Sequence, residues 1–444
     1  MPTDPRRPRR GRSAGRRLVV ALAVVACAAL ALPPLVHTAG ERSAVMGAGG
    51  VSPAEPLTSA AAPTSRHARV EQPRRAPAST SATGTGTAAP DYAAIVEDEA
   101  YWVSTAQLTC TGDGAGAIAE ARVVGTGFVS VHPYEANIGA RAMVAAGGRY
   151  LPMVRHWIDW YLSKLSAPDT SGVDGTVYEY DYDPVTCAGR FQQRPGSPVV
   201  PTYDSTDAYA GTFLTLVTAY ARADPAAARA LDTPQVRAGL VRVADAIGAT
   251  RKPSGLTAAT PTYDAEYLLD NIEAQQGLAD YAWLLGTVFD DQPAATARAA
   301  EAAAMREAIE RILWAGSHMP GLYAVAADKL DPSWDVWFPD SLAQLWPIMY
   351  GLGDESRRSA LWTGFSARWP GWQDSTPAYG TISPDHDPNS SVARAAAVIG
   401  DRGALDAYLR SSQARWIATG RPPPWTVDDS GFRALAAQVG IGDR

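Results

Sequence analysis

The chain has 444 residues and a formal net charge of −7, and 46% of its residues are hydrophobic. This length allows one large domain plus tails and excludes a small fold that depends on disulfide bonds for its stability. Residues 1–17 contain seven arginines and one aspartate, so the rest of the chain is more acidic than the whole. An acidic surface repels phosphate backbones, which argues against nucleic acid as a partner and favours neutral or cationic ligands.

The N-terminal segment has the order of regions found in a secretion signal, because an apolar run, residues 18–32, follows the arginines. Three outcomes stay open for residues 1–39: cleavage near Ala39, lipid attachment at Cys27, or retention as a membrane anchor. Two prolines directly after the run weaken the third outcome, since a spanning helix needs about 20 apolar residues. We expect an exported protein, extracellular or in the cell envelope, that contacts a membrane only through this segment.

Residues 40–90 consist mainly of Ala, Ser, Thr, Gly and Pro with scattered Arg. Such a segment buries too little apolar surface to offset the entropy lost on ordering, so we expect a disordered tether. The domain is predicted to occupy residues 91–444. Two states stay open for its cysteines, Cys110 and Cys187: a disulfide bond in an oxidising compartment, or two buried thiols.

From residue 91 onward, apolar residues recur with a helical period, and two kinds of helix alternate. Leu151, Val154, Ile158 and Leu162 lie on one face, as expected of a helix that packs on one side only. Other segments are apolar nearly all round, as expected of helices covered on every side. One-sided helices are predicted near residues 91–108, 150–165, 234–249, 296–314, 356–368 and 403–417. More buried helices are predicted near residues 135–146, 205–222, 267–288, 339–351, 388–399 and 428–438.

Six outer helices that alternate with six inner helices are the pattern of an all-α (α/α)6 toroid of six helical hairpins. In such a toroid the inner helices run parallel to one another. We expect Pro347 to kink the fourth inner helix. Short β-strands are predicted in loops, at residues 123–131 and 176–182, where β-branched and aromatic residues meet turn signals.

Parallel inner helices bring their N-terminal ends together at one end of the barrel. Each of the six predicted starts carries at least one acidic residue, and five add His, Tyr or Trp. Capping accounts for part of this pattern, because Asp is a preferred N-cap and acids in the first turn suit the helix dipole. Asp204, followed by Asp207, fits such a cap. Capping leaves unexplained the density of acids around Asp270 and the large ring of Trp337 near Asp340.

Carbohydrates suit a site that combines aromatic and acidic side chains. The C–H face of a sugar lies on an aromatic ring, and its hydroxyl groups need acceptors such as Asp, Glu and Asn. Hydrolysis of a glycosidic bond requires two carboxyl groups, one protonated and one ionised. Crowding several carboxyls at one place raises the pKa values of some of them. The helix starts therefore predict a groove that binds and cleaves a carbohydrate.

Several segments also resemble those of a known superfamily: DGAGAIAEA, VHPYEANIGARAMV, VYEYDYD, YDSTDAYAGTFLTLV, YLLDNIEAQQGL and WFPDSLAQLWPIMYG, in this order. They make residues 95–400 resemble the six-hairpin glycosidases. The resemblance implies an (α/α)6 barrel and cleavage of a polysaccharide by a pair of acids at the floor of a groove. It concerns the general layout of the superfamily and selects no single family within it.

Position in this layout selects the candidate site residues. Asp207 and Asp270 are predicted to be acid and base, in unassigned order, with Asp204 as the substitute. The residues predicted to line the sugar-binding subsites are His132, Tyr134, Glu135, Asn137, Asn271, Glu273, Trp337 and Asp340. Structural alternatives stay open: the aspartates as caps, the aromatic residues as core, and His132 as a hydrogen-bonding strut.

The leading hypothesis for the function is a glycoside hydrolase that acts on an extracellular or cell-envelope polysaccharide or oligosaccharide. A noncatalytic carbohydrate-binding protein of the same fold is the first alternative. A polysaccharide lyase is the second, but it needs Tyr, His or Arg against a uronate, which an acidic groove disfavours. The sequence has no glycine-rich phosphate loop, HExxH, paired CxxC or GxSxG motif, so no cofactor and no metal site are predicted. We expect the protein to be a monomer.

Overall fold

The computed structural model describes residues 89–442, apart from residues 126, 193–200 and 378–382. The predicted export segment and nearly all of the predicted tether lie outside the described residues. Within the described part of the chain, no helix combines the length and the apolar character that crossing a membrane requires.

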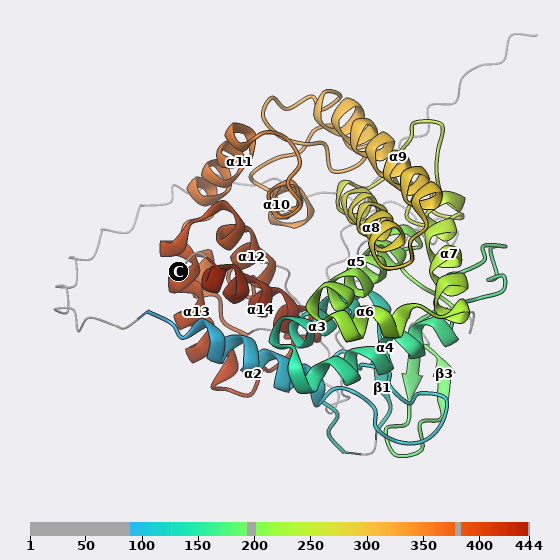
Figure 1. Ribbon diagram of the computed structural model, residues 1–444. Coiled ribbons are helices and arrows are strands. Elements are labelled where there is room, and N and C mark those ends of the chain that lie inside the picture. Colours follow the sequence, from blue (N-terminus) through green and yellow to red (C-terminus); the bar gives the residue numbers. More distant parts are fainter. Residues whose placement is uncertain (1–88, 126, 193–200, 378–382, 443–444) are drawn as a thin grey trace, which may run out of the picture. The chain divides into compact units, whose positions relative to one another are not determined.

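Six inner helices form a ring in the described part of the chain, which Figure 1 shows along its axis. Each inner helix contacts the next, and the last contacts the first, so the ring is closed. Their side chains are buried on nearly every face, as the apolar composition predicts. The inner helices are α3 (Pro133–Ala146), α5 (Asp207–Ala223), α8 (Leu268–Thr287), α10 (Leu345–Met349), α12 (Ser390–Ile399) and α14 (Val427–Gly442).

Outer helices cover this ring and bury one face each. In α4 the buried side chains of Val154, Trp157, Ile158 and Tyr161 form a single stripe, which matches the predicted period. The outer helices are α2 (Tyr92–Ser104), α4 (Leu151–Ser163), α7 (Pro234–Ala249), α9 (Gln292–Ala308), α11 (Glu355–Arg368) and α13 (Arg402–Ser412), with a short extra helix, α6 (Pro225–Leu231), between α5 and α7 in the chain. The alternation of inner and outer helices confirms the predicted all-α toroid.

Side-chain caps are common in the outer ring and rare in the inner ring, with the outer helix α4 as an exception because it has no side-chain cap. Helices α2, α7, α9, α11 and α13 follow an Asp or Thr whose side chain accepts a hydrogen bond from the first turn. Helices α3, α5, α8, α10 and α12 have no such bond from the N-cap side chain. Their acids, Glu135, Asp207 and Asp270, lie inside the first turn instead. Capping by the preceding residue therefore does not account for the acids of the inner ring.

The fourth inner helix is interrupted rather than merely kinked. A short π-helical turn, η3 (Trp337–Ser341), precedes α10. The helical conformation is interrupted at Gln344, between the two. Pro347 has no N–H to donate to the Ala343 carbonyl, which removes one bond of a continuous helix. The side chain of Gln344 accepts a hydrogen bond from the Tyr323 N–H at 2.8 Å and donates one to the Tyr323 carbonyl at 3.0 Å, which fixes the break in place.

Glycines allow neighbouring inner helices to touch backbone to backbone. A Cβ atom at Gly211 of α5 would lie 2.5 Å from the carbonyl oxygen of Glu273 in α8, and one at Gly277 would lie 2.4 Å from that of Gly211. Between α3 and α14, a Cβ atom at Gly431 would lie 2.3 Å from the carbonyl oxygen of Ile138. These distances exclude any side chain, so the ring is narrow and its helix starts lie close together.

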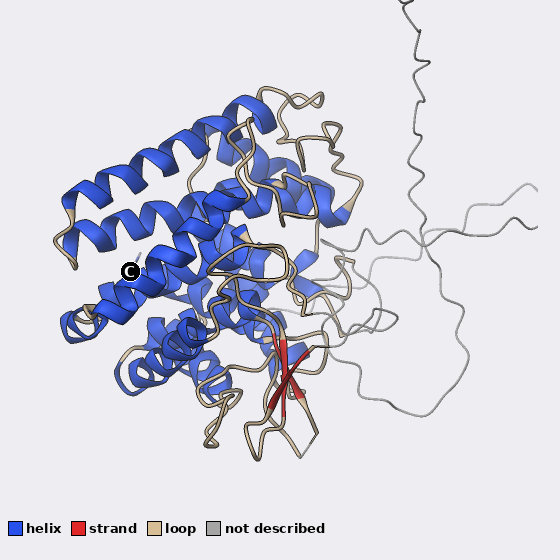
Figure 2. Cartoon of the chain, turned by 90° about the vertical axis from the view of Figure 1, so that its right-hand side faces the viewer, coloured by secondary structure: helices blue, strands red, loops and turns tan. Residues whose placement is uncertain are grey.

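One three-stranded antiparallel sheet, in the order β1-β2-β3, is drawn in red in Figure 2. Strands β1 (Val129–Val131) and β2 (Tyr180–Tyr182) lie within the two segments predicted as strands. Strand β3 (Gly189–Phe191) was not predicted, because its three residues are all exposed and show no alternation of apolar and polar residues. Val131 of β1 pairs with Tyr180 of β2.

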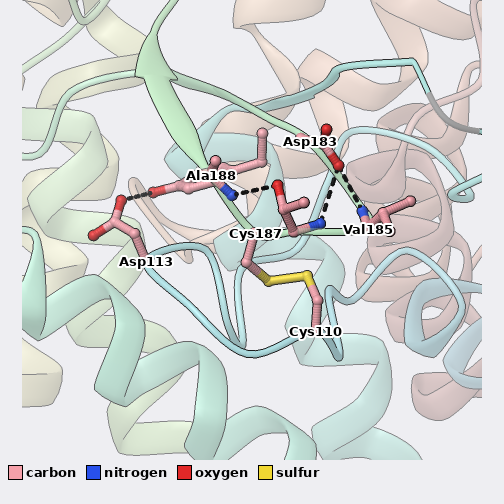
Figure 3. The surroundings of a disulfide bond; sticks show 8 residues. Cys110, Asp113, Asp183, Val185, Cys187 and Ala188 are labelled. Atoms are coloured by element: carbon pink, nitrogen blue, oxygen red, sulfur yellow. Dashed lines mark hydrogen bonds between the residues drawn. A yellow bond between two sulfur atoms is a disulfide. The ribbon is translucent and has the colours of Figure 1, made fainter.

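A disulfide bond between Cys110 and Cys187 ties the segment before β1 to the hairpin of β2 and β3 (Figure 3). Their Cα atoms are 5.6 Å apart. Asp183 organises the hairpin turn, because its Oδ1 accepts hydrogen bonds from the N–H groups of Val185 at 2.8 Å and Thr186 at 3.0 Å. Of the two states that the sequence left open for the cysteines, the structure has the disulfide.

Gly277→Ala is expected to lower the free energy of unfolding by about 2 kcal/mol, because overpacking a filled interior costs about 1–3 kcal/mol. Urea unfolding followed by circular dichroism measures the change. Gly248→Ala is the matched control: it lies on α7 with nothing within 4 Å of its Cβ position, and alanine favours helix over glycine. Equal losses in the two variants would contradict the backbone contact between α5 and α8.

Reduction of the disulfide is expected to destabilise the domain by about 4 kcal/mol, since it releases a loop closed over 77 residues of sequence separation. Urea titrations with and without a thiol reductant measure this difference. The double variant Cys110→Ser, Cys187→Ser should show the lower stability under both conditions. A midpoint that does not respond to reductant in the parent protein would refute this expectation.

Candidate functional site

A pocket of about 150 Å³ lies where the inner helices begin. Residues at the starts of α3, α5, α8, α12 and α14, and in the η3–α10 segment, all contribute to its lining. Because the starts of all these helices meet at one place, the inner helices run in the same direction, as the sequence predicts.

The pocket combines apolar rings with acidic groups. Its apolar lining consists of Tyr134, Tyr209, Leu269, Phe338, Leu342, Trp346 and Phe432. Its acidic lining consists of Glu135, Asp204, Asp270, Asp387, Asp428 and Asp429. Such a surface can bind a group that has both a C–H face and several hydroxyl donors.

Asp270, in the first turn of α8, is 2% exposed and lies on the pocket wall. Its Oδ2 accepts a hydrogen bond from the Ser205 hydroxyl at 3.3 Å, whereas its Oδ1 has no hydrogen-bond partner among the described residues. Burial, followed by the negative charges of Asp207 and Glu273, raises the pKa of Asp270 well above its ordinary value. Asp270 therefore keeps a proton at pH values at which solvated carboxyls are ionised.

Asp207 lies behind Ser205 and does not line the pocket. Its Oδ1 accepts hydrogen bonds from the Ser205 hydroxyl at 2.7 Å and the Ala208 N–H at 3.0 Å, and its Oδ2 accepts one from the Thr257 hydroxyl at 2.5 Å. Burial raises the pKa of Asp207 to about 6, and the hydrogen bonds act against this rise. Ser205 has one hydroxyl hydrogen and lies within reach of both Asp207 and Asp270, so the two carboxyls are linked through it.

Glu273 lies one turn further along α8, beneath the pocket. Its Oε1 accepts hydrogen bonds from the Tyr134 hydroxyl and the Trp346 indole N–H, both at 2.9 Å. Burial raises the pKa of Glu273 to about 8, and these two bonds act against the rise. Glu273 therefore holds two rings of the pocket lining in place and does not itself face the pocket.

Asp428 and Asp429 lie across the ring from Asp270, because α14 stands opposite α8 (Figure 1). Asp429 is buried, and its two oxygens accept hydrogen bonds from the Ser390 hydroxyl at 2.6 Å and the Thr426 N–H at 3.0 Å. Asp428 is only partly buried, and its Oδ1 accepts a hydrogen bond from the Thr426 hydroxyl. The predicted site includes no residue at this start, although the acid present at every inner start was a signal for it.

His132 lies among glutamates beside the pocket. Its Nε2 is 2.8 Å from an oxygen of Glu120 and 2.8 Å from Gln192 Oε1, and its Nδ1 is 3.9 Å from Glu135. Burial alone would lower the pKa of His132, but the negative charges of Glu120, Glu179 and Glu135 raise it well above its ordinary value. Of the described residues, Glu120, His132 and Glu135 are the group with metal-ligand spacing, within 4.8 Å of one another.

Four other predicted subsite residues lie outside the pocket lining because their polar atoms bind groups of the chain itself. Asn137 accepts a hydrogen bond from the Trp157 indole N–H at 3.0 Å, and Asn271 donates to the carbonyl of Thr257 at 3.0 Å. Asp340 accepts from the Lys329 ammonium at 2.5 Å. The indole N–H of Trp337 donates to Asp387, 3.2 Å away, which does line the pocket. Their positions thus lend no support to direct contact with a substrate.

Tyr134, Glu135, Asp204 and Asp270 are the predicted site residues that line the pocket. The sequence did not single out the aromatic residues Trp346 and Phe432, because both lie within long apolar segments and resemble core residues. That Trp346 and Phe432 line the pocket becomes apparent only when the orientation of each inner helix about its own axis is known. In the structure, their ring centroids are 6.3 Å apart in an edge-to-face arrangement.

No protein-family model matches the chain, and no curated protein matches it. Among solved structures, a wild-type glycosidase is similar, with 14% sequence identity and a TM-score of 0.52 over 79% of this chain and 97% of that chain. A GH63 mannosylglycerate hydrolase from Thermus thermophilus, in complex with glucose, is similar with 12% identity and a TM-score of 0.51 over 78% of this chain and 99% of that chain. At this identity the similarities show a shared fold, and they agree with the predicted resemblance to the six-hairpin glycosidases.

The buried carboxyl of Glu273 is expected to make the domain less stable as the pH rises. In the unfolded chain a glutamate has a pKa of about 4.3, whereas in the folded protein burial raises that of Glu273 to about 8. Between these values the folded state binds more protons, so stability falls by up to about 1 kcal/mol per pH unit and levels off above about pH 8.

Urea unfolding at several pH values between these limits measures this effect. Glu273→Gln should flatten the decline, because the amide is neutral throughout. Glu307→Gln, at a side chain that is 80% exposed, is the control and should leave the decline unchanged. Parallel pH profiles for the parent and Glu273→Gln would rule out the raised pKa.

Proposed function

We propose that the protein is a glycoside hydrolase in which Asp270 donates the proton to the glycosidic oxygen and Asp428 is the ionised carboxylate on the opposite wall. The observation that carries the proposal is the state of Asp270: a buried carboxyl on the pocket wall, held protonated, with one oxygen that has no partner among the described residues. A general acid for glycoside cleavage is a carboxyl that its surroundings keep protonated next to the bond to be cleaved. The six-hairpin glycosidase fold of the chain is consistent with this chemistry.

The lining of the pocket supports a sugar as the ligand. Trp346, Phe338 and Phe432 offer apolar surfaces for the C–H face of a sugar ring, and the surrounding carboxyls accept hydrogen bonds from its hydroxyl groups. A volume of about 150 Å³ corresponds to a single six-membered ring. We infer that one sugar unit occupies the pocket during cleavage.

Asp428 is the best of the acids for the ionised role. Asp429 is fixed by Ser390 and Thr426, and Asp387 accepts from the indole of Trp337. Asp428 is more exposed than either, so water stabilises its charge. As the ionised partner it would activate a water molecule or attack the anomeric carbon directly.

Asp207, one of the two residues predicted as acid and base, takes a different role in this proposal. It lies behind the pocket wall, and its negative charge raises the pKa of Asp270. Asp204, the predicted substitute, lines the pocket and also raises the pKa of Asp270. Both are therefore positioned to keep the proton on Asp270 until the substrate takes it.

Asp270→Asn and Asp428→Asn are each expected to lower kcat by about 10²–10⁴-fold, the usual contribution of acid–base catalysis. The assay incubates the protein with a panel of glycans and follows new reducing ends together with the absorbance of unsaturated products. Asp335→Asn, at a side chain that is 80% exposed and paired with Arg368, is the control and should retain full activity. Circular dichroism and the urea midpoint confirm that each variant is folded.

The outcomes separate the alternatives. New reducing ends without unsaturated product support the hydrolase, whereas both signals together indicate a lyase. Glycan binding by the parent protein without cleavage, unchanged in Asp270→Asn, indicates a noncatalytic binding protein. Cleavage that survives in folded Asp270→Asn would overturn the assignment of the acid.

A further inference from the structure

A second cavity, of about 240 Å³, lies along the same axis at the other end of the inner ring. Apart from Phe432, which lines both, its lining residues on the inner helices lie further along those helices than the residues of the pocket. On α3 the lining moves from Glu135 to Arg141, and on α12 from Ser390 to Arg394, a displacement of one to two helical turns. This cavity is therefore separate from the pocket to which we assigned catalysis.

The lining of this second cavity is rich in hydrogen-bond donors. Arg141 and Arg394 face it from α3 and α12, together with the hydroxyl groups of Thr215 and Tyr350. The one carboxylate in this lining is Asp280, whose charge is balanced by an ion pair with Arg222. One Asp280 oxygen is 3.0 Å from a guanidinium nitrogen of Arg222, and the other accepts from Gln276 at 3.0 Å.

Arg141 and Arg394 have no carboxylate within ion-pair distance among the described residues. Arg394 donates to the backbone carbonyl of Leu435 at 2.7 Å, and the Nε of Arg141 is inaccessible to solvent and has no hydrogen-bond partner. Burial, followed by the positive charge of Arg141, lowers the pKa of Arg394 to about 10. The charge of Arg141 acts on the Glu273 carboxyl, but burial raises the pKa of Glu273 to about 8. Glu273 is therefore mostly neutral at pH 7 and does not balance the charge of Arg141.

Two guanidinium groups that repel each other without a counter-charge are unfavourable in a folded interior. Arginines near the C-terminal ends of helices can stabilise exposed carbonyls, but the carbonyl that Arg394 binds belongs to Leu435, a buried residue in the middle of α14. Helix-end stabilisation also leaves the Nε of Arg141 without a hydrogen-bond partner among the described residues. An anion between the two groups would satisfy both, because guanidinium forks match the oxygens of phosphate, sulfate and carboxylate.

We propose that this cavity binds a small oxyanion, phosphate, sulfate or carboxylate, between Arg141 and Arg394. The walls supply hydroxyl donors from Thr215 and Tyr350 for its remaining oxygens. The anion site does not involve Asp270 or Asp428. A test of this site is therefore independent of a test of the proposed hydrolase activity.

Isothermal titration calorimetry with inorganic phosphate, sulfate and acetate, each at constant ionic strength, tests the proposal. Saturable binding of at least one of these anions by the parent protein is expected. Arg141→Gln and Arg394→Gln should each weaken that binding by about tenfold or more, since charge-assisted hydrogen bonds are lost. Arg368→Gln, at an exposed arginine outside the cavity, should bind as the parent does. The order of the three anions shows which oxyanion the cavity fits best.

Thermal unfolding provides a second readout that does not depend on calorimetric sensitivity. Without added oxyanion, Arg141→Gln should melt at or above the temperature of the parent, because it removes the repulsion with Arg394. The anion that binds should raise the melting temperature of the parent and of Arg368→Gln by mass action, but not that of Arg141→Gln. Equal responses of the parent and Arg141→Gln would overturn the proposal, as would the absence of binding for all three anions.

An Arg394→Gln variant that fails to fold leaves Arg141→Gln and Arg141→Lys to decide the question. Lysine keeps the positive charge but loses the planar fork, so Arg141→Lys should bind the anion more weakly than the parent and more tightly than Arg141→Gln. Identical binding by all three proteins would contradict a site at Arg141.

Discussion

The close contact between inner helices is the constraint on which the rest of the structure depends. Gly211 and Gly277 let α5 and α8 meet at their backbones, and Gly431 does the same for α14 against α3. The resulting ring is so narrow that six helix starts enclose a pocket of about 150 Å³. Acids that are far apart in the sequence are thereby forced into a small volume with little water.

The electrostatics of the site follow from this confinement. Carboxyls that lose their hydration and lie near one another cannot all ionise, so protons are retained by the most buried of them. Asp270 and Glu273 sit one turn apart on the same face of α8 and are both affected. Asp428 is less buried than either of these two residues. In the proposed mechanism, α8 supplies the protonated group and the opposite helix, α14, supplies the charged one.

The helices themselves could be predicted because their apolar period is visible in the sequence. The α7 helix was predicted at residues 234–249 and has the same bounds in the structure. The break at Gln344 was only partly foreseen: Pro347 signals a disturbance, but the bonds that fix its position come from the distant backbone of Tyr323. Strand β3 carries no apolar pattern and could not be inferred.

The acids at the helix starts could also be recognised, but not which of them face the pocket. Asp204, in the loop before α5, and Asp270, in the first turn of α8, both reach the pocket. Successive residues of a helix point about 100° apart, so Asn271 turns away from the pocket toward Thr257, to which Asp207 is also bonded. That rotation depends on packing between helices, which single-sequence periodicity does not determine. The proposed chemistry therefore uses the helix ends that the sequence indicated, and it assigns the roles of the individual side chains differently.

Phe432 of α14 lines both the acidic pocket and the arginine-lined cavity. Together with Trp346 and the bonded pair of Tyr134 and Glu273, it forms a partition across the axis of the barrel. The partition lies between the acids at one end and the arginines at the other, so a single ring of helices contains two environments of opposite charge. A smaller side chain at position 432 would thin this partition and turn two chambers into one passage.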